Sequence, residues 1–248
     1  MTDDEGDLTY PGGGVRLYVD APLSKGAPIA LDGDQSHYLA HVMRAKPGDR
    51  LSLFNGSDGE WMASVAAVAK RGVTLSVDRQ IGPQTETPDV WLVLAPIKKT
   101  PLDYVTQKAA ELGVRRIQPV MTRRTIVARV NTERMRANAV EAAEQSGRVS
   151  VPEVREPVSL DRLLDGWEPD RALLFCDEGG DATPLRAVHA PKAAILTGPE
   201  GGFDPAEREM LRAQSFVIPV TVGPRILRAD TAALAALAVW QSTCGDWT

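Results

Sequence analysis

The sequence has few residues of the kinds that build metal centres or disulfide frameworks: two of its 248 residues are cysteine and three are histidine. Cys176 and Cys244 lie within or beside apolar segments, and their spacing fits neither a metal site nor a set of disulfides, so we expect reduced thiols that pack. His37 and His41 share one face of an expected short helix, but no nearby ligand motif completes a metal site. We therefore expect no metal and interpret both histidines as packing or surface residues.

Long apolar runs are also missing. The longest candidate, Thr231 to Trp240, is half of the roughly 20 residues that a bilayer-crossing helix needs. The N-terminal stretch MTDDEGDLTYPGGG is acidic and lacks the basic-then-apolar order of a secretory signal. We therefore expect a cytoplasmic protein without a membrane segment.

Nucleotide-binding motifs are absent from the glycine-rich stretch GPEGGF at residues 198–203. It has neither the GxGxxG of a dinucleotide fold nor the Lys-Ser/Thr pair of a P-loop, and the carboxylate of Glu200 would repel a phosphate. These absences disfavour binding of a nucleoside triphosphate.

Two strand-loop-helix patterns dominate what is present. Apolar runs at Ala193–Leu196 and Phe216–Val222 each end in a Gly-Pro loop, and each loop precedes a helical pattern. Loops at the carboxyl ends of parallel strands form the usual ligand crevice of an α/β sheet. Bare Gly backbone beside Ile226 and Leu227 suits a flat, neutral ligand such as adenine. Alternatively, both loops are merely tight turns.

Four segments differ in pattern. Residues 1–14 are acidic and glycine-rich and are expected to be a disordered tail. Residues 15–81 show short strands and turns, which predict a small, mostly antiparallel β-barrel or sandwich. Residues 82–89 are rich in Pro and Thr and indicate a linker. Residues 90–248 alternate strands with helices, which predicts a mainly parallel α/β sheet covered on both faces.

Capping residues indicate where three helices begin. Thr100 followed by Pro101 predicts an N-cap and first helical position, and Asn131 is expected to cap the next helix. Asp204 and Glu207 form a capping-box pattern around a proline.

The last helix, expected from Asp230 to Ser242, contains ALAALAVW and is apolar all round. Such a helix must be buried on more than one side, either in the core or at a subunit interface. Asp230 at its start is interpreted as an N-cap.

Basic residues concentrate in the middle of an acidic chain. Residues 98–148 carry 11 Lys/Arg and 5 Asp/Glu, a net charge of +6, whereas the other segments carry 17 and 28, a net charge of −11. This patch suits a phosphate backbone, and solvated helix faces explain it equally well.

Three motifs carry a family resemblance. LTGPEGGFDPAE, VGPRILRADTAAL and the upstream AAEQSGR at residues 142–148 resemble those of the RsmE family, the 16S ribosomal RNA uracil-N3 methyltransferases of the SPOUT class. HYLAHVMRAKPGD and LFNGSDGEW resemble the family's small RNA-binding domain. The resemblance implies a C-terminal α/β trefoil knot that binds S-adenosylmethionine, a PUA-like N-terminal barrel, 16S rRNA of the small ribosomal subunit as partner, and a homodimer through the knotted domain.

The resemblance also implies site residues. The implied cofactor-binding residues lie along the two Gly-Pro loops: Leu196, Thr197, Gly198, Glu200, Gly201, Gly202, Gly223, Pro224, Ile226, Leu227 and Arg228. The implied RNA-binding residues are His37, Arg44, Arg123, Arg124 and Arg148, and Glu144 and Gln145 are expected near the site.

The expected chemistry singles out two catalytic candidates. The methyl group of S-adenosylmethionine needs no metal, but a uracil N3 carries a proton and is a poor nucleophile until that proton leaves. Arg228 is the candidate cation that stabilises the uracil anion, and Asp230 is a candidate base besides its role as a cap. Two other functions stay open: a nucleotide-utilising α/β enzyme, and a non-catalytic RNA-binding or ribosome-assembly protein.

Overall fold

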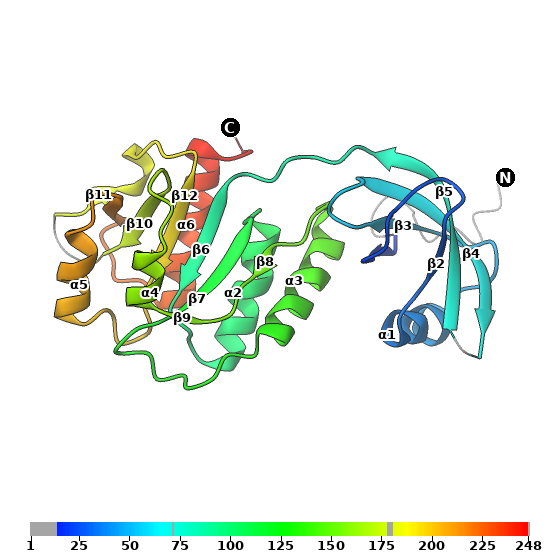
Figure 1. The fold of residues 1–248 in the computed structure, drawn as a ribbon, viewed down its shortest axis with the longest axis horizontal. Coiled ribbons are helices and arrows are strands. Elements are labelled where there is room, and N and C mark those ends of the chain that lie inside the picture. The colour runs from blue at the N-terminus through cyan, green and yellow to red at the C-terminus, as the bar shows by residue number, and fades with distance from the viewer. Residues whose placement is uncertain (1–13, 71, 178–180, 248) are drawn as a thin grey trace. The chain divides into compact units, whose positions relative to one another are not determined.

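The computed structural model describes residues 14–247 except 71 and 178–180. The chain forms two compact units (Figure 1). One comprises the residues up to Glu86 together with Ala143–Ser150, and the other comprises Thr87–Ala142 and the chain from Val151 onward. The expected disordered tail, apart from residue 14, lies outside the described residues. In the described ranges, no helix combines the length and the apolar character that a membrane crossing requires.

A five-stranded sheet forms the N-terminal unit, in the order β1-β3-β4-β5-β2. Its strands are β1 (Arg16–Tyr18), β2 (Pro28–Ala30), β3 (Arg50–Phe54), β4 (Glu60–Ala69) and β5 (Gly72–Gly82). Only β1 and β3 run parallel among these pairs, so the sheet is mostly antiparallel as expected. Alternate residues of β5, namely Val73, Leu75 and Val77, are buried in the unit's core because successive side chains point to opposite faces.

A short helix covers this core. The expected short helix that carries His37 and His41 is α1 (Gly33–His37), which continues as the π-helical turn η1 (Tyr38–Val42). The exposed rings of His37 and His41 lie 4.8 Å apart, centroid to centroid. Arg44 follows with φ of +55°, the one positive φ at a non-glycine residue in the described part of the chain.

Arg16 explains why residues 143–150 group with the N-terminal unit. Its Nη1 donates to the carbonyls of Ala143 and Glu144, and its Nη2 donates to the carbonyl of Arg148, each at 3.0 Å. Ala143 and Glu144 lie in the last turn of the helix at Thr132–Ser146, and Arg148 follows it. Backbone acceptors at such a helix end lack partners within the helix. The grouping differs from the expected continuous domain at residues 90–248, because it depends on contacts across more than 120 residues of sequence.

An eight-stranded sheet forms the C-terminal unit, and every recorded pair in it is parallel. Its strand order is β11-β13-β10-β12-β6-β7-β8, and β9 also pairs with β7. The strands are β6 (Val90–Leu94), β7 (Arg116–Met121), β8 (Glu153–Val154), β9 (Val158–Ser159), β10 (Ala172–Cys176), β11 (Thr183–Pro184), β12 (Ala193–Thr197) and β13 (Val217–Thr221). The central β6 and β12 are buried along their whole length, as expected for strands covered on both faces.

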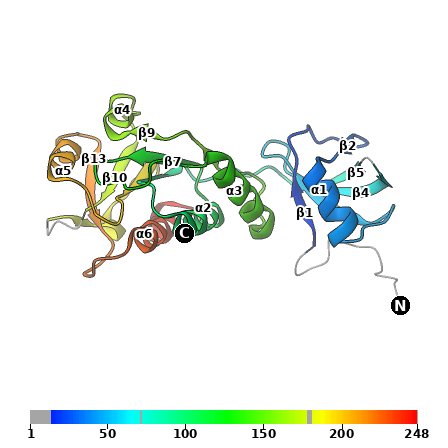
Figure 2. The same cartoon turned by 90° about the horizontal axis from the view of Figure 1, so that it is seen from below.

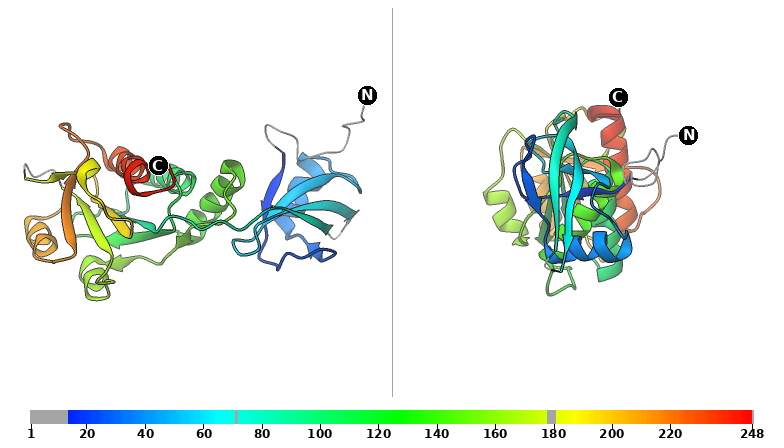
Figure 3. Two further views of the ribbon diagram at one scale, coloured as in Figure 1. Left: turned by 90° about the horizontal axis from the view of Figure 1, so that it is seen from above. Right: turned by 90° about the vertical axis from the view of Figure 1, so that its right-hand side faces the viewer.

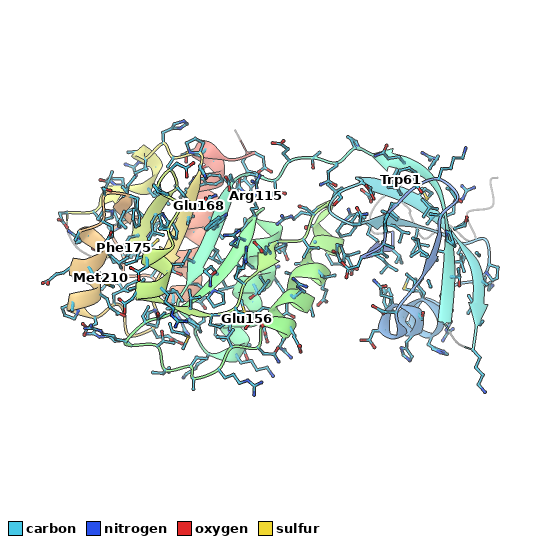
Figure 4. All side chains as sticks on the ribbon, in the orientation of Figure 1. Trp61, Arg115, Glu156, Glu168, Phe175 and Met210 are labelled. Atoms are coloured by element: carbon cyan, nitrogen blue, oxygen red, sulfur yellow. The ribbon has the colours of Figure 1, made fainter. Side chains whose placement is uncertain are left out.

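Helices cover both faces of this sheet. They are α2 (Lys99–Glu111), α3 (Thr132–Ser146), α4 (Leu160–Asp165), α5 (Pro205–Arg212) and α6 (Ala229–Cys244), with the 3₁₀ turn η2 (Leu185–Ala187). α2 and α6 pack on the face that contains Leu92, and α4 and α5 pack on the face that contains Val93. Figures 2 and 3 show α6 and α4 on opposite sides of the strands. Phe175 of β10 and Met210 of α5, labelled in Figure 4, belong to the second cluster.

The helix starts test the capping predictions. Asn131 accepts the N–H of Arg134 at 2.9 Å, and the expected capping box of Asp204 is present at α5, so both predictions are confirmed. The prediction for α2 is wrong, because its N-cap is Lys98 and Thr100 lies inside the first turn. The N–H groups of a helix's first turn have no partner within the helix, so a proline, which lacks an N–H, is tolerated at any position of that turn. Pro101 therefore does not fix the residue at which α2 begins.

Candidate functional site

A groove of about 770 Å³ opens at the carboxyl ends of β10, β12 and β13. β10 lies between the other two strands in the sheet, so the loops after β12 and β13 form walls on either side of it. The lining residues are Arg124, Cys176, Asp177, Thr197–Phe203, Arg208, Val220–Ala229 and Ala232. The two Gly-Pro loops thus line one groove, and their role in binding a cofactor stays a prediction.

The loop after β12 requires its first glycine. The N–H of Gly202 donates to the carbonyl of Pro199 at 2.9 Å and closes a turn. A Cβ at Gly198 would lie 2.7 Å from the ring of Phe203, which packs edge-on against Phe175 with ring centroids 5.0 Å apart. Only glycine therefore lets Phe203 fold back onto the core beneath this loop.

The loop after β13 leaves free space beside Gly223. Thr221 accepts the N–H of Gly223 at 3.3 Å and donates its hydroxyl to the carbonyl of the same residue at 3.0 Å. A Cβ at Gly223 would meet no protein atom within 4 Å in the described structure. Ile226 follows with 80% of its surface exposed, so this wall offers bare backbone and an apolar side chain to a ligand.

The catalytic candidates lie where this loop enters α6. Arg228 is the N-cap residue, and its side chain is 79% exposed with Nε 3.9 Å from Asp230 Oδ1. Asp230 lies inside the first turn and accepts the N–H of Thr231 at 2.8 Å, so its interpretation as the N-cap is wrong. α6 begins one residue earlier than expected because Ala229 already has helical backbone. The carboxylate near a helix N-terminus is nevertheless favourable.

Arg123 and Arg124 hold the start of α5 and the first loop. The backbone N–H of Arg123 donates to the buried carboxylate of Glu207 at 2.8 Å, and its Nη1 lies 3.1 Å from Asp204 Oδ1. Nη1 of Arg124 donates to the carbonyl of Gly201 at 3.0 Å. The segment after β7 therefore braces the groove wall, which the sequence alone did not predict.

An ion-pair cluster forms the floor beside β10. Asp177, with 2% of its side chain exposed, accepts from Arg208 Nη2 at 2.7 Å and from Arg212 Nε at 2.8 Å. Arg212 also binds Asp181 through two hydrogen bonds of 2.7 Å, which lower the pKa of Asp181 to about 2. Both arginines come from α5, so the cluster fixes that helix to the end of β10.

Cys176 also lines the groove. Burial raises the pKa of its thiol to about 12 because a thiolate would lose its hydration. At neutral pH the group is therefore a thiol and a poor nucleophile. This agrees with the expected packing role.

The predicted site residues divide between this groove and other places. Thr197 and all predicted loop residues from Gly198 to Arg228 line it, whereas Leu196 is buried in the core. Asp230 and Arg123 lie just outside the lining set. His37, Arg44, Glu144, Gln145 and Arg148 belong to the N-terminal unit.

Among the lining residues that sequence reasoning missed are Asp177, Phe203 and Arg208. Asp177 follows the apolar run of β10 directly, so the strand-end rule that located the other loops would have found it. Arg208 lies on a helix and carries no such signal.

Two family models match the chain. An RNA methyltransferase domain matches residues 85–241, and an RNA methyltransferase PUA domain matches residues 31–78. The chain is 31% identical over 229 residues to the ribosomal RNA small subunit methyltransferase E of Rickettsia conorii, covering 90% of this chain and 93% of that protein. It is also 31% identical to the enzyme of the same name from Bacillus subtilis, covering 87% and 90%.

Solved structures agree with these matches. The methyltransferase E of Neisseria gonorrhoeae bound to S-adenosyl methionine is 30% identical, with a TM-score of 0.87 over 94% of this chain and 99% of that one. A putative methyltransferase of Legionella pneumophila in complex with the same cofactor is 31% identical, with a TM-score of 0.84 over 92% and 97%. The expected PUA-like domain and SPOUT-class α/β domain are confirmed, and the threading of the knot stays a prediction. The chain therefore belongs to the ribosomal RNA small subunit methyltransferase E family.

Proposed function

We propose that this protein transfers the methyl group of S-adenosylmethionine to N3 of a uridine in 16S rRNA of the small ribosomal subunit. One observation carries the proposal: both Gly-Pro loops form a single groove at the carboxyl ends of three parallel strands. Its volume of about 770 Å³ is within the usual range for a small-molecule site. A ribosomal substrate also supports the expected cytoplasmic location.

The test of this proposal has two steps. Calorimetric titration of the purified protein with S-adenosylmethionine should show saturable binding. Incubation with small ribosomal subunits and methyl-labelled cofactor should then yield N3-methyluridine in the digested 16S rRNA. A non-catalytic RNA-binding protein would give neither result.

Arg228 and Asp230 are proposed to act on the acceptor base. A guanidinium that lies on the groove wall and is 79% exposed is free to approach a uracil carbonyl, where negative charge develops as the N3 proton leaves. The carboxylate of Asp230, 3.9 Å from Arg228 Nε, supports the orientation of that guanidinium. Its place one residue beyond the lining residue Ala229 supports a role as the base.

The proposal includes RNA contacts in the N-terminal unit and a homodimer. The exposed His37 and Arg44 lie on and after η1, and Arg148 lies in the same unit, so these side chains suit contacts to rRNA. In α6, Leu234 and Ala238 are only partly buried by their own subunit. An apolar helix with such a face supports pairing with a second copy.

Replacing Gly223 with valine should sharply reduce S-adenosylmethionine binding while the fold survives. A Cβ at this position would meet no protein atom within 4 Å in the described structure, so we expect the branched side chain to collide with the ligand. The backbone φ of +157° adds a strain of roughly 1–3 kcal/mol. Calorimetry measures the affinity and thermal unfolding measures the strain.

Gly26→Val is the matched control, because Gly26 also has a positive φ and open space but lies in the N-terminal unit. It should lose comparable stability and keep full affinity. Unchanged affinity in folded Gly223→Val protein would remove this loop from the site.

Alanine at both Arg123 and Arg124 should weaken binding of rRNA and flatten its salt dependence, because each lost phosphate contact removes counterion release. The single-turnover rate at saturation of both substrates should be nearly intact. Since Arg124 also holds the carbonyl of Gly201, the affinity for S-adenosylmethionine should fall as well. Filter binding at several salt concentrations and rapid-quench assays measure these effects, and an unchanged salt slope would contradict the phosphate contacts.

A further inference from the structure

Arg208 lies on a helix, lines the groove, and is held in place by a contact within the protein. It projects from α5, which begins directly after the loop that follows β12, and 40% of its side chain is exposed. Its Nη2 donates to the buried carboxylate of Asp177 at 2.7 Å. A guanidinium held this way is ordered before any ligand arrives, so binding through it costs little side-chain entropy.

The charge of Arg208 is incompletely balanced. Asp177 is shared with Arg212, and Arg212 has a second carboxylate in Asp181, whereas the described residues give Arg208 only its share of Asp177. Nε of Arg208 is buried and has no hydrogen-bond partner among the described residues. A ligand cannot reach this buried atom, but 40% of the side chain is exposed, and an anionic acceptor suits a guanidinium best.

The other arginines of the groove are less suited to hold an anion at a fixed point. Arg124 already donates from Nη1 to the carbonyl of Gly201. Arg225 and Arg228 lie in the exposed loop after β13, and the side chain of Arg228 is 79% exposed. Binding an anion would order these long side chains at a cost in conformational entropy. For Arg208 this cost is smaller, because the contact with Asp177 already orders its side chain.

We propose that Arg208 binds the α-carboxylate of the methionine moiety of the cofactor, an assignment that rests on the proposed function. S-adenosylmethionine combines a flat adenosine with an amino-acid end that carries one carboxylate. The bare backbone and apolar Ile226 suit the adenosine, and the fixed guanidinium beside β10 suits the carboxylate. Asp177 acts through Arg208 and is a positioning residue.

The test compares two ligands that differ only in this carboxylate: S-adenosylhomocysteine and its decarboxylated analogue, which keeps the amine. Calorimetry on the full-length wild type should give about tenfold or greater preference for S-adenosylhomocysteine, the scale of one charge-assisted hydrogen bond. Arg208→Gln should lose that preference and bind both ligands with similar affinity. Its amide is still able to donate to Asp177, and thermal unfolding checks the fold.

Arg212→Gln is the matched control, because Arg212 shares Asp177 but does not line the groove. It should keep the preference even if both affinities fall together. Arg208→Lys retains the charge and should restore part of the preference. Such a recovery would show that the charge at this position recognises the carboxylate and does not only stabilise the groove.

Two results would overturn the assignment: a wild type without preference, or a preference that Arg208→Gln retains. Wild-type protein that binds neither ligand would contradict the proposed function itself, and the assignment with it. An equal loss of both affinities in Arg208→Gln, with the preference kept, would make Arg208 a structural brace.

Discussion

Arg228→Ala should lower the single-turnover rate by about a hundredfold or more when the enzyme is saturated with cofactor and rRNA, the usual scale for loss of one charge-stabilising donor. The side chain is 79% exposed and makes no capping hydrogen bond at the start of α6, so its removal should leave stability unchanged. A donor aimed at charge that develops on the uracil affects the transition state more than the bound ground state. Rapid-quench measurement of methyl transfer tests this directly.

Arg225→Ala is the matched control, because Arg225 is an exposed arginine in the same loop and also lines the groove. It should keep the saturated rate. A wild-type rate in Arg228→Ala protein would contradict the catalytic assignment and make Asp230 the next residue to test. A parallel fall of cofactor affinity and rate would indicate that Arg228 only braces the loop.

The parts of the site that follow from local sequence were predictable. Each Gly-Pro loop directly follows an apolar run, and parallel strands bring such loops to one edge of the sheet, so the groove between Gly198 and Gly223 followed from the order of elements alone. The capping box at Asp204 was equally local, since its partner is three residues away.

The parts that depend on distant contacts were not predictable. The hydrogen bonds of Arg16 to the end of α3 join residues 127 or more positions apart, and those from α5 to Asp177 join residues at least 31 positions apart. No periodicity relates such residues. The prediction that Asp230 is the N-cap was wrong for another reason. A carboxylate is favourable both at the N-cap and in the first turn, so its presence does not fix where a helix begins.

The apolar sequence of α6 allowed two interpretations, burial in the core or a subunit interface. In the structure, different residues of the helix are relevant to each. Ala236, Leu237 and Trp240 are fully buried in their own subunit's core. Leu234 and Ala238 lie on another side of the helix and are only partly buried. The core accounts for the first set, and the proposed homodimer concerns the second.

Replacing Leu237 with aspartate should therefore unfold the subunit rather than merely separate a dimer. The change removes a fully buried Leu and places a carboxylate in the core, which should cost about 3–5 kcal/mol or more of the free energy of unfolding. We expect insoluble protein or a loss of the cooperative thermal transition, with no cofactor binding. Circular dichroism and calorimetry measure both.

Leu234→Asp is the variant that tests the homodimer. Its position is partly exposed in one subunit, so an added carboxylate can stay hydrated in a folded monomer but not in a closed apolar interface. Light scattering at micromolar concentration should give a dimer mass for the wild type and for Leu234→Met, and a monomer mass for Leu234→Asp with unchanged circular dichroism. A monomeric wild type would contradict the homodimer, and a dimeric Leu234→Asp would place the interface elsewhere. Because S-adenosylmethionine should bind each groove, retained affinity in the monomer would show that one subunit holds the whole cofactor site, whereas lost affinity would make the partner's presence necessary.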